Sequence, residues 1–243
     1  MCGSRFGVTK VATASLSAGA TLRAEAQAMY DRTGRIFGGD EQLIMVEHDA
    51  WSCLPSRKEI RDHRLAARLR DALRTVPPVS LPMTCFRGID YLDPSVVATS
   101  KDCGAPPAEY ATPYRFNPAK VPVLYLSESI LGVNAELSAR SRRRWLQRFV
   151  LPTTLTLGDL SALDRKHPAN QAMFYAEMKN RDGDRDNEYL FSQVVAELLQ
   201  EAFPGGIRVL GARDAPERYK NIVIFDHADW LSWVDGVPFI EVP

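Results

Sequence analysis

A proline-rich segment near residue 80 limits how this chain of 243 residues can fold. It reads Val76-Pro77-Pro78-Val79-Ser80-Leu81-Pro82. No helix continues through it, because each proline lacks a backbone donor and restricts the residue before it. We therefore predict an N-terminal extension over residues 1–80 and a second domain over residues 83–243.

The N-terminal extension is expected to be mostly helical. Residues Leu22–Thr33 are rich in alanine and amphipathic, whereas Glu41–Glu47 could form a short strand. Ser56 and Glu59 have the spacing of a capping box, which predicts a helix from there to about Arg74. The extension could dock a partner, regulate the second domain or add packing, and the sequence leaves these roles open.

The second domain alternates short apolar runs with helical patterns. We predict strands over Val121–Leu126, Ile207–Leu210 and Asn221–Phe225, and helices over Ser129–Phe149 and Glu188–Phe203. The irregular order of these elements favours an α+β fold over a doubly wound one. The proline-rich stretch Asp93–Pro113 is expected to be a loop that could cover a pocket, and Arg181–Asn187 to be a charged loop.

Composition excludes several classes of function. Lys plus Arg and Asp plus Glu both number 30, so no basic field favours nucleic acid. No glycine-rich phosphate loop and no apolar run of membrane-spanning length occur, and the first 20 residues lack a signal-peptide core. A cytoplasmic protein that binds neither nucleic acid nor membrane is therefore expected.

Cysteine and histidine spacing gives no sign of a metal site. The four cysteines form no C-x-x-C pair, so we expect reduced thiols rather than a zinc or disulfide framework. The four histidines have no paired nucleophile at a recognisable spacing, so nothing supports a Ser–His or Cys–His hydrolase.

The most informative polar residues surround one predicted strand. Arg115 and Asn117 lie in a turn that leads directly into the Val121–Leu126 strand, and Glu136 follows in the next predicted helix. Upstream, Arg87 lies between Phe86 and Gly88 at the end of an apolar run.

These segments resemble the RES domain, a toxin family named for its Arg, Glu and Ser. The likeness continues through Tyr189, Ser192-Gln193 and Asn221–Asp226 and covers about residues 83–243. The resemblance implies an ADP-ribosyltransferase-like mixed sheet flanked by helices. It also implies an enzyme that uses NAD⁺ as its substrate, with no further cofactor, and an antitoxin partner that carries a helix-turn-helix domain.

Cleavage of the nicotinamide–ribose bond builds positive charge on the ribose, as glycoside hydrolysis does. Nicotinamide leaves from a cationic state, so one carboxylate suffices, and we assign that role to Glu136. Tyr125 could stack on nicotinamide or orient a ribose hydroxyl, although a strand tyrosine is commonly a core residue. A solvated helix glutamate is the alternative for Glu136.

Two arginines are the candidates for holding the dinucleotide. A guanidinium grips a phosphate with two parallel hydrogen bonds, so we assign Arg87 and Arg115 to NAD⁺, with pairing to a structural carboxylate as the alternative. Asn117 could bind a ribose or only make a turn. Ser192 and Gln193 could line the same pocket or be surface polar groups.

The chain departs from the family pattern at two positions. Gly211 or Ala212 stands where the family usually has its Ser, and Tyr114 stands where it usually has Gly. These changes leave two alternatives open: a catalytically silent nucleotide-binding module and an ADP-ribosyltransferase that modifies one protein. The arginine cluster Arg140–Arg144 is interpreted as a solvated helix face or a contact for an acidic partner, rather than a nucleic-acid site.

Overall fold

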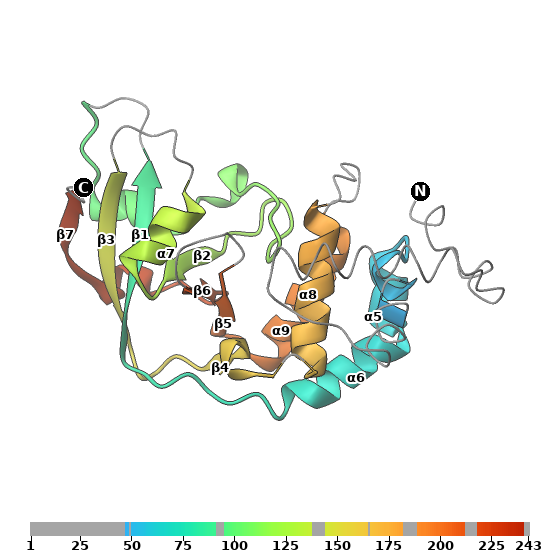
Figure 1. The fold of residues 1–243 in the computed structure, drawn as a ribbon. Coiled ribbons are helices and arrows are strands. Elements are labelled where there is room, and N and C mark those ends of the chain that lie inside the picture. Colours follow the sequence, from blue (N-terminus) through green and yellow to red (C-terminus); the bar gives the residue numbers. More distant parts are fainter. Residues whose placement is uncertain are drawn as a thin grey trace.

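The protein is an α+β fold built on a seven-stranded mixed sheet. The computed structural model describes residues 47–48, 50–90, 95–137, 144–164, 166–181, 189–211 and 218–240. The strands lie in the order β4-β5-β6-β2-β1-β3-β7. Figure 1 shows β1, β3 and β7 on one side of the molecule and the helices α5, α6, α8 and α9 on the other.

All the described strand pairs except one are antiparallel. The exception joins β4 to β5, which run parallel. The strands are β1 (Met83–Asp90), β2 (Leu124–Ser127), β3 (Arg144–Leu151), β4 (Leu157–Asp159), β5 (Gly206–Leu210), β6 (Lys220–Ile224) and β7 (Val234–Ile240). Short 3₁₀ turns at Ser100–Cys103, Ala108–Tyr110, Leu160–Ala162 and Trp230–Trp233 complete the connections.

Five α-helices are described over their full length, and residues 50–52 are also helical. The five are α5 (Arg57–Asp62), α6 (Arg64–Leu73), α7 (Ile130–Glu136), α8 (Pro168–Arg181) and α9 (Leu190–Ala202). The capping role predicted for Ser56 is confirmed, since its hydroxyl accepts from the Glu59 backbone amide. The expected helix is interrupted at His63, whose backbone is extended and whose ring caps α6.

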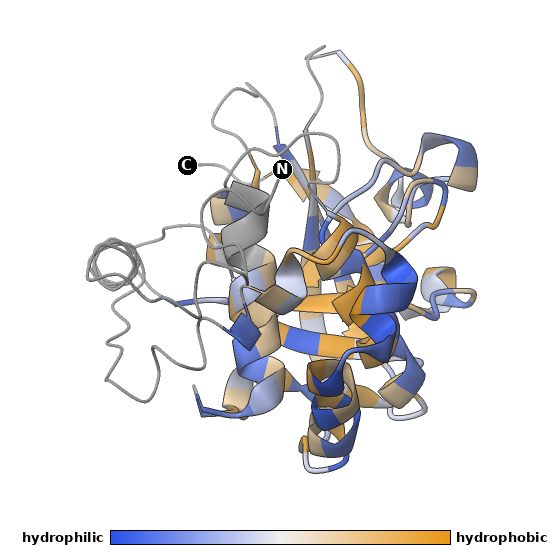
Figure 2. Cartoon of the chain, turned by 90° about the vertical axis from the view of Figure 1, so that its right-hand side faces the viewer, coloured by the Kyte–Doolittle hydropathy of each residue, from blue (hydrophilic) through white to orange (hydrophobic). Residues whose placement is uncertain are grey.

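The sheet separates two hydrophobic cores. Neighbouring residues of β6 point to opposite faces, so Val223 joins one core while Ile222 and Ile224 join the other. The larger core also contains the apolar faces of α5, α6, α8 and α9, including Leu69 of α6, together with Trp51, which precedes α5. Figure 2 shows hydrophobic strands in the interior and hydrophilic residues on the outer helices. The N-terminal helices and the second domain therefore share one core.

The helix predicted over Ser129–Phe149 is wrong beyond its first two turns. Helix α7 ends at Glu136, and β3 begins at Arg144. From Trp145 onward, alternate side chains are buried at Gln147, Phe149 and Leu151, which is the period of a strand. Arg144 therefore belongs to a strand and not to a helix face, while Arg140–Arg143 lie outside the described residues.

The other predicted elements agree more closely. Strands β2, β5 and β6 and helix α9 confirm the segments expected there, within three residues at each end. Strands β1, β3, β4 and β7 and helix α8 were not predicted. The expected helix Leu22–Thr33, most of Glu41–Glu47 and all but the first residue of the charged loop Arg181–Asn187 lie outside the described residues.

Two further expectations concern thiols and membranes. Cys85 and Cys103 are free thiols, as expected. The expectation is wrong for Cys53, which is disulfide-bonded. Over the described ranges, no helix combines the length and the apolar character that a bilayer crossing requires.

Candidate functional site

Arg87 lies where two strands of the sheet separate. Strand β1 pairs with β3 along its whole length, but its described pairing with β2 is confined to Phe86 and Ser127. Arg87 is the next residue, and its Nη1 atom is buried without a hydrogen-bond partner among the described residues. Burial lowers the pKa of the Arg87 guanidinium to about 10, and the nearby Cys103 and Tyr125 oppose that shift.

Gly88 positions the helix that carries Glu136. A Cβ atom at Gly88 would lie 2.4 Å from side-chain carbons of Val133 and Leu137, so only glycine lets α7 approach β1 this closely. Ser129 begins the helix by accepting from the Gly132 amide at 3.1 Å. Glu136 is the last residue of α7, where the helix dipole disfavours a carboxylate.

Donors from the neighbouring segment hold the Glu136 carboxylate. The Tyr219 hydroxyl donates to Glu136 Oε1 at 2.7 Å, and Asn221 Nδ2 donates to the same oxygen at 2.6 Å. Hydrogen bonds to a carboxylate are stronger than neutral ones. The Glu136 side chain is therefore fixed against β6. The alternative of a solvated helix glutamate required this side chain to be free in solvent, so the structure does not support that alternative.

Tyr219 is packed between two glycines. A Cβ atom at Gly211 would lie 2.0 Å from Tyr219 Cε2, and one at Gly132 would lie 2.7 Å from Tyr219 Cδ2. The Gly211 amide also donates to the Tyr219 carbonyl at 2.9 Å. The tyrosine ring thus occupies the space that a side chain at residue 211 would need, and its hydroxyl reaches Glu136.

A second set of hydrogen bonds organises the turn that carries Arg115. Tyr114 and Asn117 exchange backbone hydrogen bonds of 2.9 and 3.2 Å across this turn. The Tyr125 hydroxyl donates to Asn117 Oδ1 at 2.8 Å, so a side chain of strand β2 holds the turn in place. Burial raises the pKa of Tyr125, and the nearby Arg115 opposes that shift.

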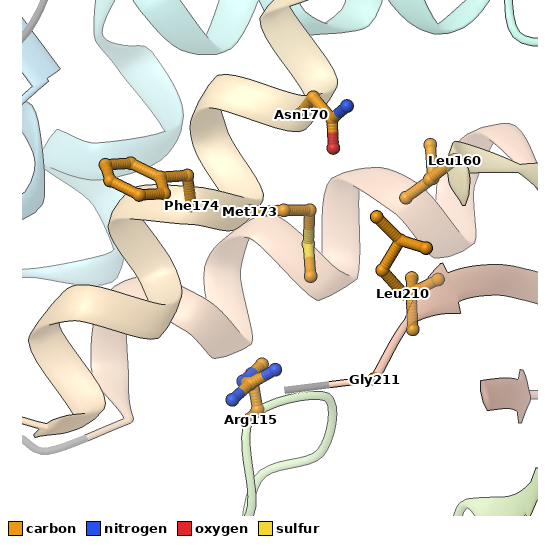
Figure 3. A pocket seen from close by; sticks show the side chains of 8 residues that line it. Arg115, Leu160, Asn170, Met173, Phe174, Leu210 and Gly211 are labelled. Atoms are coloured by element: carbon orange, nitrogen blue, oxygen red, sulfur yellow. The ribbon is translucent and has the colours of Figure 1, made fainter. Parts of the chain in front are cut away.

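Arg115 lines a small cavity between the turn, α8 and β5. The cavity has a volume of about 50 Å³. Figure 3 shows the Met173 side chain pointing toward Arg115 and Gly211 lying beside it. Arg115 Nε is buried and has no hydrogen-bond partner in the described part of the chain. The lining residues are Arg115, Leu160, Asn170, Met173, Phe174, Val209, Leu210 and Gly211.

Gly211 connects the cavity to Glu136. It lines the cavity with Arg115 and packs against Tyr219, which binds Glu136. Asn221, the other donor to Glu136, is paired in the sheet with Val209, which also lines the cavity. Tyr125 in turn lies within electrostatic reach of both Arg87 and Arg115.

Ser192 and Gln193 are both buried in α9, so the alternative of surface polarity is wrong for them. Gln193 Nε2 donates to the Asn117 carbonyl at 3.3 Å and therefore belongs to the turn. The Ser192 hydroxyl donates within its own helix to the Tyr189 carbonyl at 3.1 Å. The structure thus brings together Arg115, Asn117, Tyr125 and Gln193, and places Ser192 one residue away.

Sequence reasoning assigned no role to Tyr219, Asn221 or Gly132. The signal for Asn221 was available, because an asparagine that opens an apolar strand needs a polar partner. Tyr219 and Gly132 had no such signal. Their contact depends on how α7 crosses the sheet, and local sequence does not specify that crossing.

Comparison with known proteins identifies a family for part of the chain. The model of the RES domain matches residues 92–238, which include Arg115, Asn117, Tyr125 and Glu136 but not Arg87. No curated protein matches the chain. Among solved structures, the crystal structure of the M. tuberculosis MbcT-MbcA toxin-antitoxin complex contains a similar chain with 13% sequence identity and a TM-score of 0.42. The similarity covers 73% of this chain and 93% of that one.

Proposed function

The chain belongs to the RES domain family, and from this membership and the geometry around Glu136 we propose that it is a toxin-type enzyme that cleaves the nicotinamide–ribose bond of NAD⁺. The proposal includes a partner protein, an antitoxin with a helix-turn-helix domain. The acceptor of the ADP-ribose group would be water or phosphate.

The observation that carries the proposal is the held carboxylate of Glu136. Two donors fix Oε1, so the side chain needs little reorganisation when positive charge develops on the ribose. Such a preorganised group is worth about 3–4 kcal/mol in the transition state. Glu136 lies at the C-terminal end of α7, where the helix dipole destabilises a carboxylate and lowers the stability of the fold. Such a cost is typical of a residue that is kept for function.

The two arginines would bind the pyrophosphate. Arg87 Nη1 and Arg115 Nε are both buried without a hydrogen-bond partner among the residues described, and an anionic oxygen would satisfy either. Tyr125 lies near both groups and would contact the nucleotide between them. The roles of Asn117 and Gln193 would then be to hold the Arg115 turn, with Ser192 as a neighbouring wall.

The cavity would hold only part of the substrate. Its volume of about 50 Å³ is well below the roughly 300–1,000 Å³ of ordinary ligand pockets. Tyr114, which is 56% exposed, lies at the start of the turn beside this cavity. An outward shift of the Tyr114–Asn117 turn would admit the dinucleotide, and the closed turn would then exclude water.

Chromatography of NAD⁺ incubated with the purified protein tests the proposal. Release of nicotinamide together with ADP-ribose identifies water as the acceptor, and a phosphorylated sugar product that needs added phosphate identifies phosphate. Intact NAD⁺ after prolonged incubation at high protein concentration would contradict the proposal.

Gly211 favours a second candidate, a nucleotide-binding module without catalysis. The family usually has a serine at the position of Gly211 or Ala212, and the ring of Tyr219 fills the space that a side chain at Gly211 would need. Calorimetry that detects NAD⁺ binding while no nicotinamide is released would support this module. Transfer of label from NAD⁺ to one discrete protein in a lysate would instead support an ADP-ribosyltransferase.

A further inference from the structure

Arg57 joins the N-terminal helices to the candidate site. It is the first residue of α5, and its Nη2 donates to Gln193 Oε1 on α9 at 2.7 Å. Its other terminal nitrogen, Nη1, pairs with Glu197 one turn further along α9. Arg57 therefore bridges an amide and a carboxylate with its two ends.

This contact fixes the orientation of the Gln193 amide. Arg57 can only donate, so it requires the carbonyl oxygen of Gln193 to face α5. The amide nitrogen must then face the opposite way, where it donates to the Asn117 carbonyl at 3.3 Å. Gln193 is only 7% exposed, so water cannot readily replace either partner.

The Asn117 carbonyl is the group through which the hydrogen bonds from Arg57 and Gln193 reach the candidate site. It also accepts from the Tyr114 amide at 2.9 Å, which closes the turn around Arg115. The side chain of Asn117 accepts from the Tyr125 hydroxyl at 2.8 Å. Three hydrogen bonds thus connect Arg57 to Tyr125, by way of Gln193 and Asn117.

We propose that Arg57 is a positioning residue for the NAD⁺ site, acting through Gln193 on the turn that carries Arg115. The inference rests on the proposed function for its link to NAD⁺. It gives the N-terminal helices a role in substrate binding, although Arg57 lies outside the residues that match the RES domain. The helix α5 would hold the turn in the conformation that presents Arg115 to the dinucleotide.

Arg61 offers a matched control. It lies one turn after Arg57 on α5 and pairs with the same Glu197, at 3.0 Å, and with Glu201. These side-chain partners are both carboxylates that follow Gln193 on α9, and the Arg61 side chain is exposed to a similar degree, 33% against 39%. Comparing Arg57→Ala with Arg61→Ala therefore separates the effect on Gln193 from the loss of an ion pair on the helix surface.

Two measurements test the proposal on the full chain. In NAD⁺ turnover, Arg57→Ala should raise KM about threefold to tenfold with little change in kcat, because the variant lacks the charged hydrogen bond that orients Gln193 and so holds the Arg115 turn less well when NAD⁺ binds. In hydrogen-exchange mass spectrometry without NAD⁺, Arg57→Ala should speed exchange in residues 112–118, and Arg61→Ala should not. Arg57→Lys, which has a single ammonium, should restore part of either effect.

The outcomes distinguish this proposal from the proposed function. Faster exchange in residues 112–118 for Arg57→Ala alone supports positioning even if the wild type releases no nicotinamide, a result that would count against the enzyme activity only. Equal exchange in both variants, or equal KM changes in both, would overturn the role of Arg57. If Arg57→Ala does not fold, Gln193→Glu serves instead, because it keeps the acceptor for Arg57 but loses the donor to Asn117.

Discussion

The Tyr219 hydroxyl donates a hydrogen bond of 2.7 Å to Glu136 Oε1, although the two residues lie 83 positions apart in the chain. The tyrosine ring is held between Gly132 and Gly211, and Asn221 donates to the same carboxylate oxygen. Two segments of the fold therefore cooperate to hold one acidic side chain. The predictions below depend on this arrangement and on the charges around it.

Tyr219→Phe removes the hydroxyl and keeps the ring between its two glycines. We expect NAD⁺ turnover to fall about tenfold, because one hydrogen bond to a charged group is worth roughly 1.5–3 kcal/mol and Asn221 keeps the other. The melting temperature should fall by several degrees, which leaves the protein folded in the assay. Steady-state kinetics checks the change, with Tyr110→Phe as the control because Tyr110 is 72% exposed. Equal turnover in the two variants would remove Tyr219 from the site.

Gly211→Ser would introduce the side chain that the family usually has near this position. A Cβ atom there would lie 2.0 and 2.1 Å from two Tyr219 ring carbons, so the ring must move away from Glu136. We expect lower turnover and a loss of about 1–3 kcal/mol in unfolding free energy, as for other overpacked sites. Gly211→Ala should behave in the same way, since the clash begins at Cβ. Higher turnover in the serine variant alone would show that the hydroxyl matters more than the tyrosine contact.

Arg87 is expected to oppose folding while it serves binding. Burial lowers its pKa to about 10, so the folded state disfavours the charged form. Between this pKa and the higher pKa of the arginine in the unfolded chain, the unfolded chain binds more protons than the folded one, and stability rises with pH in that window. Below it, including neutral pH, the full cost of the buried charge remains.

Arg87→Met removes this charge and keeps most of the side-chain volume. We expect the unfolding free energy at neutral pH to rise by roughly 0.5–2 kcal/mol, as stabilising substitutions commonly achieve, while NAD⁺ binding weakens. Urea unfolding and calorimetry measure the two effects. A destabilised variant that binds NAD⁺ normally would mean that Arg87 is a structural residue.

The ion pair between Asp159 and Arg208 should account for part of the loss of folding stability at acidic pH. Burial would raise the pKa of Asp159, but hydrogen bonds from Arg208 and Ser161 outweigh it and hold that pKa below its usual value. The pair therefore stabilises the fold above the unfolded-state pKa of about 3.9, and this contribution is lost as the pH falls through the lower folded-state pKa.

Arg208→Ala leaves the Asp159 carboxylate buried without its main donor. We expect a loss of about 3–5 kcal/mol in unfolding free energy at pH 7, and a smaller loss below about pH 4, where Asp159 becomes protonated. Urea unfolding at both pH values measures this. Arg148→Ala is the control, because its pair with Asp235 is close to half exposed and should be worth less than about 1 kcal/mol. A loss for Arg208→Ala that does not depend on pH would contradict the role of Asp159.

Local sequence predicted the elements whose signals lie within a few residues. Helix α9 has an apolar face and ends before Pro204-Gly205, and β6 contains the apolar run Ile222–Ile224. Strand β3 was predicted as a helix because Leu137 and Trp145 fall near helical spacing. Gln147, Phe149 and Leu151 are buried while Arg148 and Val150 are exposed, and this alternation becomes clear only when the burial on both faces of the sheet is known.

The candidate site divides in the same way. Arg115, Asn117 and Tyr125 lie close in sequence, and their grouping was predicted and agrees with the hydrogen bonds of the turn. The contacts of Gln193 with Asn117 and of Tyr219 with Glu136 join segments 76 and 83 positions apart. A single sequence contains no signal for such pairs, because they depend on how α7 and α9 pack against the sheet.

Nicotinamide release by Glu136→Gln, compared with the wild type in the same NAD⁺ assay, tests the role of the held carboxylate most directly. The amide keeps an oxygen that can accept from Tyr219 and Asn221, so the melting temperature should stay within a few degrees while the negative charge is lost. We predict a fall in turnover of about 10²–10³-fold, as for removal of one preorganised electrostatic group. Turnover equal to that of the wild type in a folded Glu136→Gln variant would contradict the account.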